Sequence, residues 1–256
     1  MKYFLTAIDQ MKIALFSDIH ANLPALQSFF EDVSKHNPDA IYCLGDLVGY
    51  NIWPNEVIQE IRQRGIATIA GNHDAKVKGV QPAESSKAGK GYAYDIIDND
   101  NRVYLQTLPA HLRISFQLNS DILTMLLVHG SPRSIDEYLL EDMEEAALLN
   151  TFLEARTDIL CFGHSHKPYH RIVPANGEEQ PRFLHAINTG SIGKPKDGNP
   201  QGGYVLLHIK DNSSTLDKDS IQVEFVRFDY DIEKAAQAVE NSPLPDDFAD
   251  MLRKAY

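Results

Sequence analysis

Two histidines stand one residue apart in the stretch CFGHSHKPYH, directly after a short apolar run. Residues two apart in an extended segment point to the same face, so His164 and His166 can converge on one object. Taken alone, such a pair is more often two surface histidines in a loop. Its interpretation as a ligand pair therefore depends on similar side chains elsewhere in the chain.

Similar side chains end several other strand-like runs. The stretches SDIH, LGD, AGNHD and VHG each follow an apolar run and each contain a metal-ligand residue type. Imidazole suits Zn, Fe, Mn, Co and Ni, and carboxylate and amide oxygens also admit harder ions, so the set predicts a transition-metal site rather than a calcium or magnesium site. With GHSH included, the seven residues are Asp18, His20, Asp46, Asn72, His129, His164 and His166.

The elements that must position these residues alternate between strands and helices. KIALFSD is a continuous apolar run typical of a buried strand, and NLPALQSFFEDVSKH has helical periodicity, with Asn22 as the expected N-cap and Pro24 in the first turn. AIYCLGD predicts a second strand, PNEVIQEIRQRG a helix, and IATIAGNHD a third strand with its loop. This order predicts a largely parallel sheet, whose ligands bind at the carboxyl ends of the strands.

The second half of the chain predicts another sheet. HLRISFQL and ILTMLLVHG suggest a strand pair, DMEEAALLNTFLEAR is helical, and TDILCFGHSH returns as a strand. The later runs YHRIVP, RFLHAINTG, GGYVLLHI and IQVEFVRF favour a mostly antiparallel sheet. We therefore predict one domain over residues 11–256, with two sheets and helices outside each. Residues 1–10 precede this domain as an extension, and a chain that starts at Met11 is expected to fold and work normally.

Composition limits the kinds of protein this chain can be. Its 256 residues, 43% apolar and 23% charged, have the make-up of a globular protein, and no apolar run or N-terminal signal predicts a membrane or export. The net charge of −12 argues against a large nucleic-acid surface. Cys43 and Cys161 lie in apolar runs, so we expect buried free thiols and a cytoplasmic location.

The motifs DIH, GD, GNHD, VHG and GHSH occur in this order between residues 18 and 166. Together they resemble the pattern of the metallophosphoesterase superfamily, also called calcineurin-like phosphoesterases. The following INTGSIGKPKDGNPQGGYVLL looks like the end of the compact bacterial and archaeal branch. The resemblance implies a four-layer α/β/β/α sandwich of two mixed sheets flanked by helices, with a small helical insertion at about residues 75–110.

The resemblance also implies how the ligands divide between two transition-metal ions, whose identity stays open among Mn, Fe, Zn, Co and Ni. A metal-bridging hydroxide would attack the phosphate in line, and no protein nucleophile would be needed. One ion would take Asp18, His20 and His166; the other would take Asn72, His129 and His164; Asp46 would bridge both.

His73 has a different expected role. The resemblance implies that it faces the substrate and stabilises developing charge or protonates the leaving oxygen, and the alternative is a structural loop histidine. Protein phosphatases of the superfamily continue as G-D-x-V-D-R-G, whose second Asp orients the catalytic histidine and whose Arg holds phosphate. Here GDLVGY has Gly49 and Tyr50 in those places. The residue that orients His73 is therefore open, with Asp74 either orienting it or capping the loop.

The insertion after the catalytic loop is where substrate choice is expected. It contains helical stretches at about residues 84–97 and 100–108, which could cover the site. Its tyrosines, Tyr92, Tyr94 and Tyr104, could stack on a nucleobase, although aromatic residues at helical spacing more often pack in a core.

Because GDLVGY supplies no cation, other side chains must meet the phosphate. The candidates are Lys76 and Lys78 after the catalytic loop, Arg133 in HGSPR, and Lys194 and Lys196 in GSIGKPKDG. We predict that Arg133, Lys194 and Lys196 bind substrate. The lysine pair is preferred because the glycines and proline of GSIGKPKDG fix a short loop on the side of the sheet where GHSH ends. Each of these cations could instead be a solvated surface charge.

We predict a dinuclear-metal phosphoesterase that hydrolyses phosphodiester or phosphoanhydride bonds of small nucleotide-like substrates, such as dinucleoside polyphosphates. The alternatives are a phosphomonoesterase or protein phosphatase of the same chemistry, or a weakly active interaction scaffold of this fold. Scaffolds can lose the catalytic histidine, whereas His73 and all seven ligand positions are present here. A homo-oligomer stays open.

Overall fold

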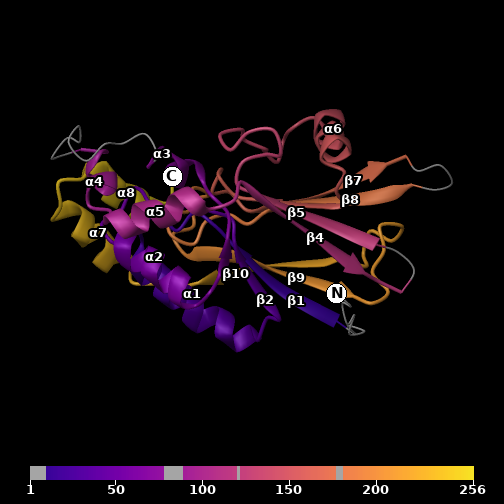
Figure 1. The fold of residues 1–256 in the computed structure, drawn as a ribbon, viewed down its shortest axis with the longest axis horizontal. Helices are drawn as coiled ribbons and strands as arrows, with labels where there is room; N and C mark the ends of the chain where they lie inside the picture. The colour runs from indigo at the N-terminus through magenta and orange to yellow at the C-terminus, as the bar shows by residue number, and fades with distance from the viewer. Residues whose placement is uncertain (1–9, 78–88, 120–121, 177–180) are drawn as a thin grey trace.

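Two five-stranded sheets pack face to face, with helices on their outer sides (Figure 1). The computed structural model describes residues 10–77, 89–119, 122–176 and 181–256. The first sheet has the strand order β10-β9-β1-β2-β3, and the second has the order β4-β5-β6-β8-β7. This arrangement confirms the predicted α/β/β/α sandwich of two mixed sheets.

The first sheet combines parallel and antiparallel strands. Its members are β1 (Gln10–Phe16), β2 (Ala40–Cys43), β3 (Ala67–Thr68), β9 (Gly202–Lys210) and β10 (Gln222–Phe228). The strands β1, β2 and β3 run parallel, as predicted, whereas β9 is antiparallel to both β1 and β10.

The second sheet has a parallel centre and two antiparallel edges. Its members are β4 (His111–Gln117), β5 (Ile122–Val128), β6 (Ile159–Phe162), β7 (Tyr169–Ala175) and β8 (Arg182–Asn188). The strands β5, β6 and β8 run parallel, and β4 and β7 pair antiparallel with β5 and β8. The four later runs pair antiparallel as expected, β7 with β8 and β9 with β10. Their expected place in one sheet was wrong, because β9 and β10 cross back to the first sheet and β8 pairs parallel with β6.

Alternation along the strands produces the layers. On β1, Leu15 faces the core between the sheets and Phe16 faces the core under the helices. On β6, Cys161 lies between the sheets and Phe162 packs toward the helix beyond the second sheet. Successive side chains of a strand point to opposite faces, so a strand with apolar residues at every position must be covered on both sides.

The helices lie mostly outside the first sheet. They are α1 (Leu23–His36), α2 (Pro54–Gln63), α3 (Asn72–Lys76), α4 (Tyr92–Asp95), α5 (Asn99–Thr107), α7 (Ile232–Glu240) and α8 (Asp247–Lys254). By contrast, α6 (Glu145–Ala155) covers the outer face of the second sheet (Figure 1). As predicted, the Asn22 side chain caps α1 by accepting a hydrogen bond from the backbone N–H of Ala25, at 3.2 Å.

Some of the predicted features lie outside the residues that the structure describes. Residues 1–9, part of the expected helical insertion and Lys78 lie outside them. Gln10 opens β1 and pairs with Lys210 of β9. Cys43 and Cys161 are buried free thiols, as expected. Across the described ranges, no helix is long and apolar enough to cross a bilayer.

Candidate metal centre

The loops at the carboxyl ends of five strands bring the predicted ligands together. The loops after β1, β2 and β3 come from the first sheet, and those after β5 and β6 come from the second. Because these strands are parallel within each sheet, their carboxyl ends lie along one edge. The ligand atoms of three residue groups lie within 4.8 Å of one another: Asp18, His20 and His166; His20, Asp46 and His73; and Asp18, Asp46 and His129.

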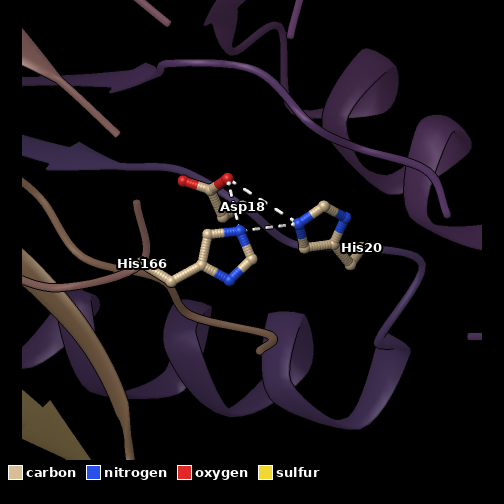
Figure 2. A group of neighbouring side chains, drawn as sticks. All are labelled: Asp18, His20 and His166. Atoms are coloured by element: carbon tan, nitrogen blue, oxygen red, sulfur yellow. Dashed lines mark hydrogen bonds and ion pairs between the residues drawn. The ribbon is translucent and has the colours of Figure 1, made fainter. Parts of the chain in front are cut away.

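The first group converges on one carboxylate oxygen (Figure 2). Asp18 Oδ1 lies 3.1 Å from His166 Nε2 and 3.7 Å from His20 Nε2, and the two Nε2 atoms are 3.1 Å apart. The other oxygen, Oδ2, accepts hydrogen bonds from Ser17 Oγ at 2.6 Å and from the N–H of His164 at 3.0 Å. Among the described residues, Oδ1 is buried and has no hydrogen bond. An anionic oxygen left bare beside two imidazole nitrogens is the environment that a cation would satisfy.

Asp46 occupies the middle of the cluster. Its Oδ2 lies 3.6 Å from His20 Nε2 and 3.4 Å from His129 Nε2. Its Oδ1 accepts a hydrogen bond from the N–H of His73 at 2.8 Å. The Asn72 side-chain oxygen lies 3.2 Å from the same His129 nitrogen, Nε2. One carboxylate oxygen thus stands between the two groups of expected ligands.

The outer nitrogens of two imidazoles are held by backbone carbonyls. His20 Nδ1 lies 3.1 Å from the Val48 carbonyl oxygen, and His129 Nδ1 lies 2.8 Å from that of Leu44. A carbonyl can only accept, so Nδ1 carries a proton in both rings and Nε2 is the nitrogen that faces the cluster. This second contact is how proteins fix the ring of a metal-binding histidine.

The GHSH histidines use opposite nitrogens. His166 Nδ1 donates to the Lys194 carbonyl oxygen at 2.5 Å, which leaves Nε2 facing the cluster. His164 instead donates through Nε2 to the Asp136 carbonyl oxygen at 3.2 Å, which leaves Nδ1 as its free nitrogen. The two imidazoles can therefore approach from different directions although they are one residue apart.

The backbone is left-handed at five of the seven ligand positions. The φ angles are 55° at Asp18, 51° at His20, 56° at Asp46, 65° at His164 and 60° at His166. Each such residue other than glycine costs on the order of 1 kcal/mol or more, so this concentration marks a site whose geometry the rest of the fold enforces.

Neighbouring charges keep the two carboxyl groups of the cluster ionised. Burial acts to raise the pKa of Asp46, but the neighbouring charges of His129 and His20 outweigh it and hold that pKa well below the usual range. His166 does the same for the pKa of Asp18. Burial lowers the pKa of His20 well below its usual value, so that ring is neutral. Against burial, the Asp46 carboxylate raises the pKa of His129 to about 10, so a metal ion would have to displace that proton.

His73 and Asp74 take separate roles in the loop after β3. Asp74 Oδ2 accepts hydrogen bonds from the N–H groups of Asp46 at 2.8 Å and Gly71 at 2.9 Å, and Oδ1 accepts one from Leu47 at 3.0 Å. Burial raises the Asp74 pKa to about 7. Of the two roles left open for Asp74, the structure supports capping the loop, because both oxygens are engaged with backbone.

Two of the predicted substrate-binding cations, Lys194 and Lys196, stand beside the cluster. Lys194 is only 1% exposed, and its Nζ lies 4.6 Å from the centre of the Tyr50 ring. Burial lowers its pKa to about 8, so it is mostly charged at neutral pH. The N–H of Lys196 donates to the His166 carbonyl oxygen at 3.3 Å. The lysine loop is thus tied to a ligand loop.

Arg133 is placed near His129, but other groups occupy its guanidinium. It pairs with Glu137 at 2.7 Å and with Glu154 at 3.2 Å. Its role in substrate binding stays a prediction, and it would require these pairs to open.

Aromatic rings around the cluster were not predicted as site residues. The Tyr50 ring centre lies 4.8 Å from that of His20 and 5.0 Å from that of His73. Tyr138, 49% exposed, stacks on His164 with ring centres 4.1 Å apart. The only sequence signal for Tyr50 was its place in GDLVGY, and no sequence pattern pointed to Tyr138.

Fold and site together define a class: a two-sheet sandwich with a histidine and carboxylate metal centre at the carboxyl ends of its strands. The family described as the calcineurin-like phosphoesterase superfamily domain matches residues 11–212, and this chain belongs to that superfamily. Its members bind metal ions and are generally metal-dependent phosphoesterases. The resemblance inferred from the motifs is confirmed.

Relatives of similar length resemble this chain in sequence or in fold. The chain is 31% identical over 252 residues to an uncharacterized protein of Methanocaldococcus jannaschii, covering 91% of this chain and 94% of that protein. A crystal structure of a metallophosphoesterase from Sphaerobacter thermophilus is 26% identical, with a TM-score of 0.74, and covers 96% of this chain and 100% of its own. A hypothetical protein from Pyrococcus horikoshii, 20% identical, shares the fold with a TM-score of 0.75 and covers 96% and 99%.

Proposed function

We propose that this protein is a phosphoesterase that holds two transition-metal ions and hydrolyses phosphodiester or phosphoanhydride bonds of small nucleotide-like substrates. The observation that carries the proposal is the position of Asp46 Oδ2 between His20 and His129, each of which turns its Nε2 toward that oxygen. Two ions held by the seven ligands would activate water and neutralise the phosphoryl oxygens.

The protein's own residues would supply orientation and charge stabilisation. The Asp46 carboxylate holds His73 beside the cluster through the His73 N–H. When the bond from phosphorus to the leaving oxygen breaks and a bond from phosphorus to the water oxygen forms, the Nε2–H group of His73 would donate a hydrogen bond that stabilises the charge on the leaving oxygen, which then takes its proton from water. Lys194, buried and without a carboxylate partner among the described residues, would meet a phosphoryl oxygen.

A cavity beside His73 supports a substrate with an aromatic group next to the phosphate. It has a volume of about 340 Å³ and is lined by Tyr50, His73, Lys76, Lys90, Tyr94 and Phe248. Its rings and lysines suit an aromatic, phosphate-bearing group.

The test is a substrate panel assayed with added Mn²⁺. Phosphomonoesters, cyclic nucleotides and dinucleoside polyphosphates would be compared at equal concentration. We expect turnover of diesters or anhydrides, its loss on chelation and its recovery on adding Mn²⁺ back. The absence of hydrolysis with Mn²⁺, Fe²⁺, Zn²⁺, Co²⁺ or Ni²⁺ would favour a scaffold, and a preference for monoesters would favour the phosphomonoesterase alternative.

The lysine loop gives a separate prediction. Replacing Lys194 and Lys196 with alanine is expected to raise KM for a polyphosphate substrate by about 10-fold or more, because each lost charge-assisted contact is worth roughly 1.5 to 3 kcal/mol. KM for bis-p-nitrophenyl phosphate should change less, since it has no distal phosphate. Lys194→Met, which retains most of the buried volume, separates charge from packing, and Lys218→Ala is the surface control. Equal effects on both substrates would remove the loop from distal phosphate binding.

A further inference from the structure

One tyrosine hydroxyl lies against the ring nitrogen of His73 that points away from the cluster. Tyr94 Oη is 2.5 Å from His73 Nδ1, and the two rings are nearly parallel, with 14° between their planes. Tyr94 belongs to α4, which lies in the segment between the catalytic loop and β4. The contact therefore joins the catalytic loop to α4, a link that the sequence patterns did not predict.

Neither Gly49 nor Asp74 offers a side chain to Nδ1, and the Tyr94 hydroxyl takes that position. A Cβ built on Gly49 would lie 2.5 Å from His73 Nδ1, so any residue with a side chain there would displace the ring. Gly49 also has a φ of 93°, which suits glycine alone. Asp74, the neighbouring carboxylate, is occupied by three backbone N–H groups.

Backbone contacts fix α4 where the hydroxyl can reach. The buried Arg102 side chain donates to the carbonyl oxygens of Ile97, at 2.9 Å, and of Tyr94. The Asn55 side chain on α2 donates to the Ile96 carbonyl oxygen at 2.8 Å. These contacts lock the short helix against α2 and α5, so the hydroxyl is held in place before a substrate arrives.

The direction of the hydrogen bond decides which nitrogen of His73 carries a proton. A tyrosine hydroxyl titrates near pH 10 when unperturbed, and burial raises the Tyr94 pKa further, so the hydroxyl keeps its proton at neutral pH. Among the described residues, His73 Nδ1 is the one acceptor within hydrogen-bond distance of this proton, so we take the hydroxyl as the donor. A neutral imidazole that accepts at Nδ1 must carry its proton on Nε2. The Nε2–H group is then the one available to a leaving oxygen.

We propose that Tyr94 is the positioning residue of His73: it donates to Nδ1 and so holds Nε2–H ready for the leaving group. The inference rests on the proposed phosphoester hydrolysis. An acidic residue after G-D orients the catalytic histidine in protein phosphatases, and here a residue of α4 would orient it instead, as a donor to Nδ1 rather than an acceptor from it. Tyr94 itself need not touch the reacting atoms.

The first test is spectroscopic and does not need turnover. In the ¹⁵N-histidine-labelled full chain, metal-free and loaded with Zn²⁺, long-range ¹H–¹⁵N correlations should show His73 as the Nε2–H tautomer. The signal is assigned by its loss in His73→Asn. Tyr94→Phe should give a tautomer mixture or the Nδ1–H form. An Nδ1–H form in the wild type, or an unchanged Nε2–H form in Tyr94→Phe, would overturn the proposal.

The second test uses aryl methyl phosphodiesters with leaving groups of increasing pKa, assayed with Mn²⁺. Tyr94→Phe should lower kcat roughly 10 to 10² fold for the poorest leaving groups and little for p-nitrophenolate, because a poor leaving group develops more negative charge and depends more on the hydrogen bond from Nε2–H. KM should stay unchanged. The matched control is Tyr256→Phe, which removes the hydroxyl of an exposed tyrosine and should match the wild type.

A double-variant comparison separates this role from general damage. In a His73→Asn background, Tyr94→Phe should cause no further loss, because its effect passes through His73. A uniform loss across all leaving groups, or an additive loss in the double variant, would make Tyr94 merely structural. A wild-type protein inactive on every diester would instead refute the proposed function, and the spectra would still decide the contact.

Discussion

Replacing Asp46 with asparagine is expected to abolish nearly all hydrolysis and to lower metal content at both positions of the centre. Asp46 Oδ2 faces His20 and His129, so it is the one ligand atom that both ions would share. An amide oxygen is neutral and binds cations more weakly than a carboxylate, while the shape of the side chain is retained. The loss in kcat/KM should be about 10³-fold or greater, since binding and activation of water both depend on the ions.

Metal analysis of the purified variants measures this directly. Asp46→Asn should bind weakly at both positions, whereas His164→Ala should weaken one position and leave the other occupied. Asp219→Asn, at an exposed loop position, is the control and should match the wild type. A normal metal content in Asp46→Asn would show that Asp46 does not bridge, and far-ultraviolet circular dichroism would verify that each variant is folded.

The sequence predicted the ligand set because the physics behind it is local and periodic. Strands of the parallel part of a sheet present their carboxyl ends along one edge, so polar residues directly after apolar runs had to meet there. The same reasoning placed Asn22 as a helix cap and Cys43 and Cys161 in cores. Each of these predictions depends on residues within a few positions of one another.

Features that depend on contacts between distant parts of the chain could not be predicted from the sequence. The run GGYVLLHI is almost continuously apolar and would fit any buried strand. No residue near it indicates that β9 pairs with β1 of the first sheet. The opposite orientations of His164 and His166 follow from which carbonyl lies behind each ring, namely those of Asp136 and Lys194. The contact of Tyr94 with His73 depends on how α4 packs, which periodicity does not specify.

The centre is organised largely by the protein itself. Hydrogen bonds from imidazoles to backbone carbonyls fix the rings, and Ser17 and the His164 N–H hold one oxygen of Asp18. Left-handed backbone at five ligand positions persists because surrounding packing enforces it. A preformed site binds ions without first ordering its ligands, so less of the binding free energy is lost to ordering.

The second large effect is expected at His73. His73→Asn should leave metal content intact and lower turnover by about 10² to 10⁴ fold, because the charge on the leaving oxygen loses its hydrogen bond from this ring. His73 lies within ligand distance of His20 and Asp46, so it could instead be taken for a metal ligand. One contact argues against that role. His73 Nδ1 faces the Tyr94 hydroxyl, and in the tautomer proposed above the proton resides on Nε2, where it would block coordination.

Metal analysis and kinetics on one preparation distinguish a catalyst from a ligand. Asparagine retains a polar side chain at this position but has no imidazole Nε2–H group, and the backbone N–H that binds Asp46 Oδ1 is unaffected. His36→Asn, at the last residue of α1, is the matched control and should retain full turnover. Finding one fewer metal ion in His73→Asn would make His73 a ligand. Intact metal content with unchanged turnover would make it a structural loop residue, and only intact metal with slow turnover supports a catalytic hydrogen bond from this ring.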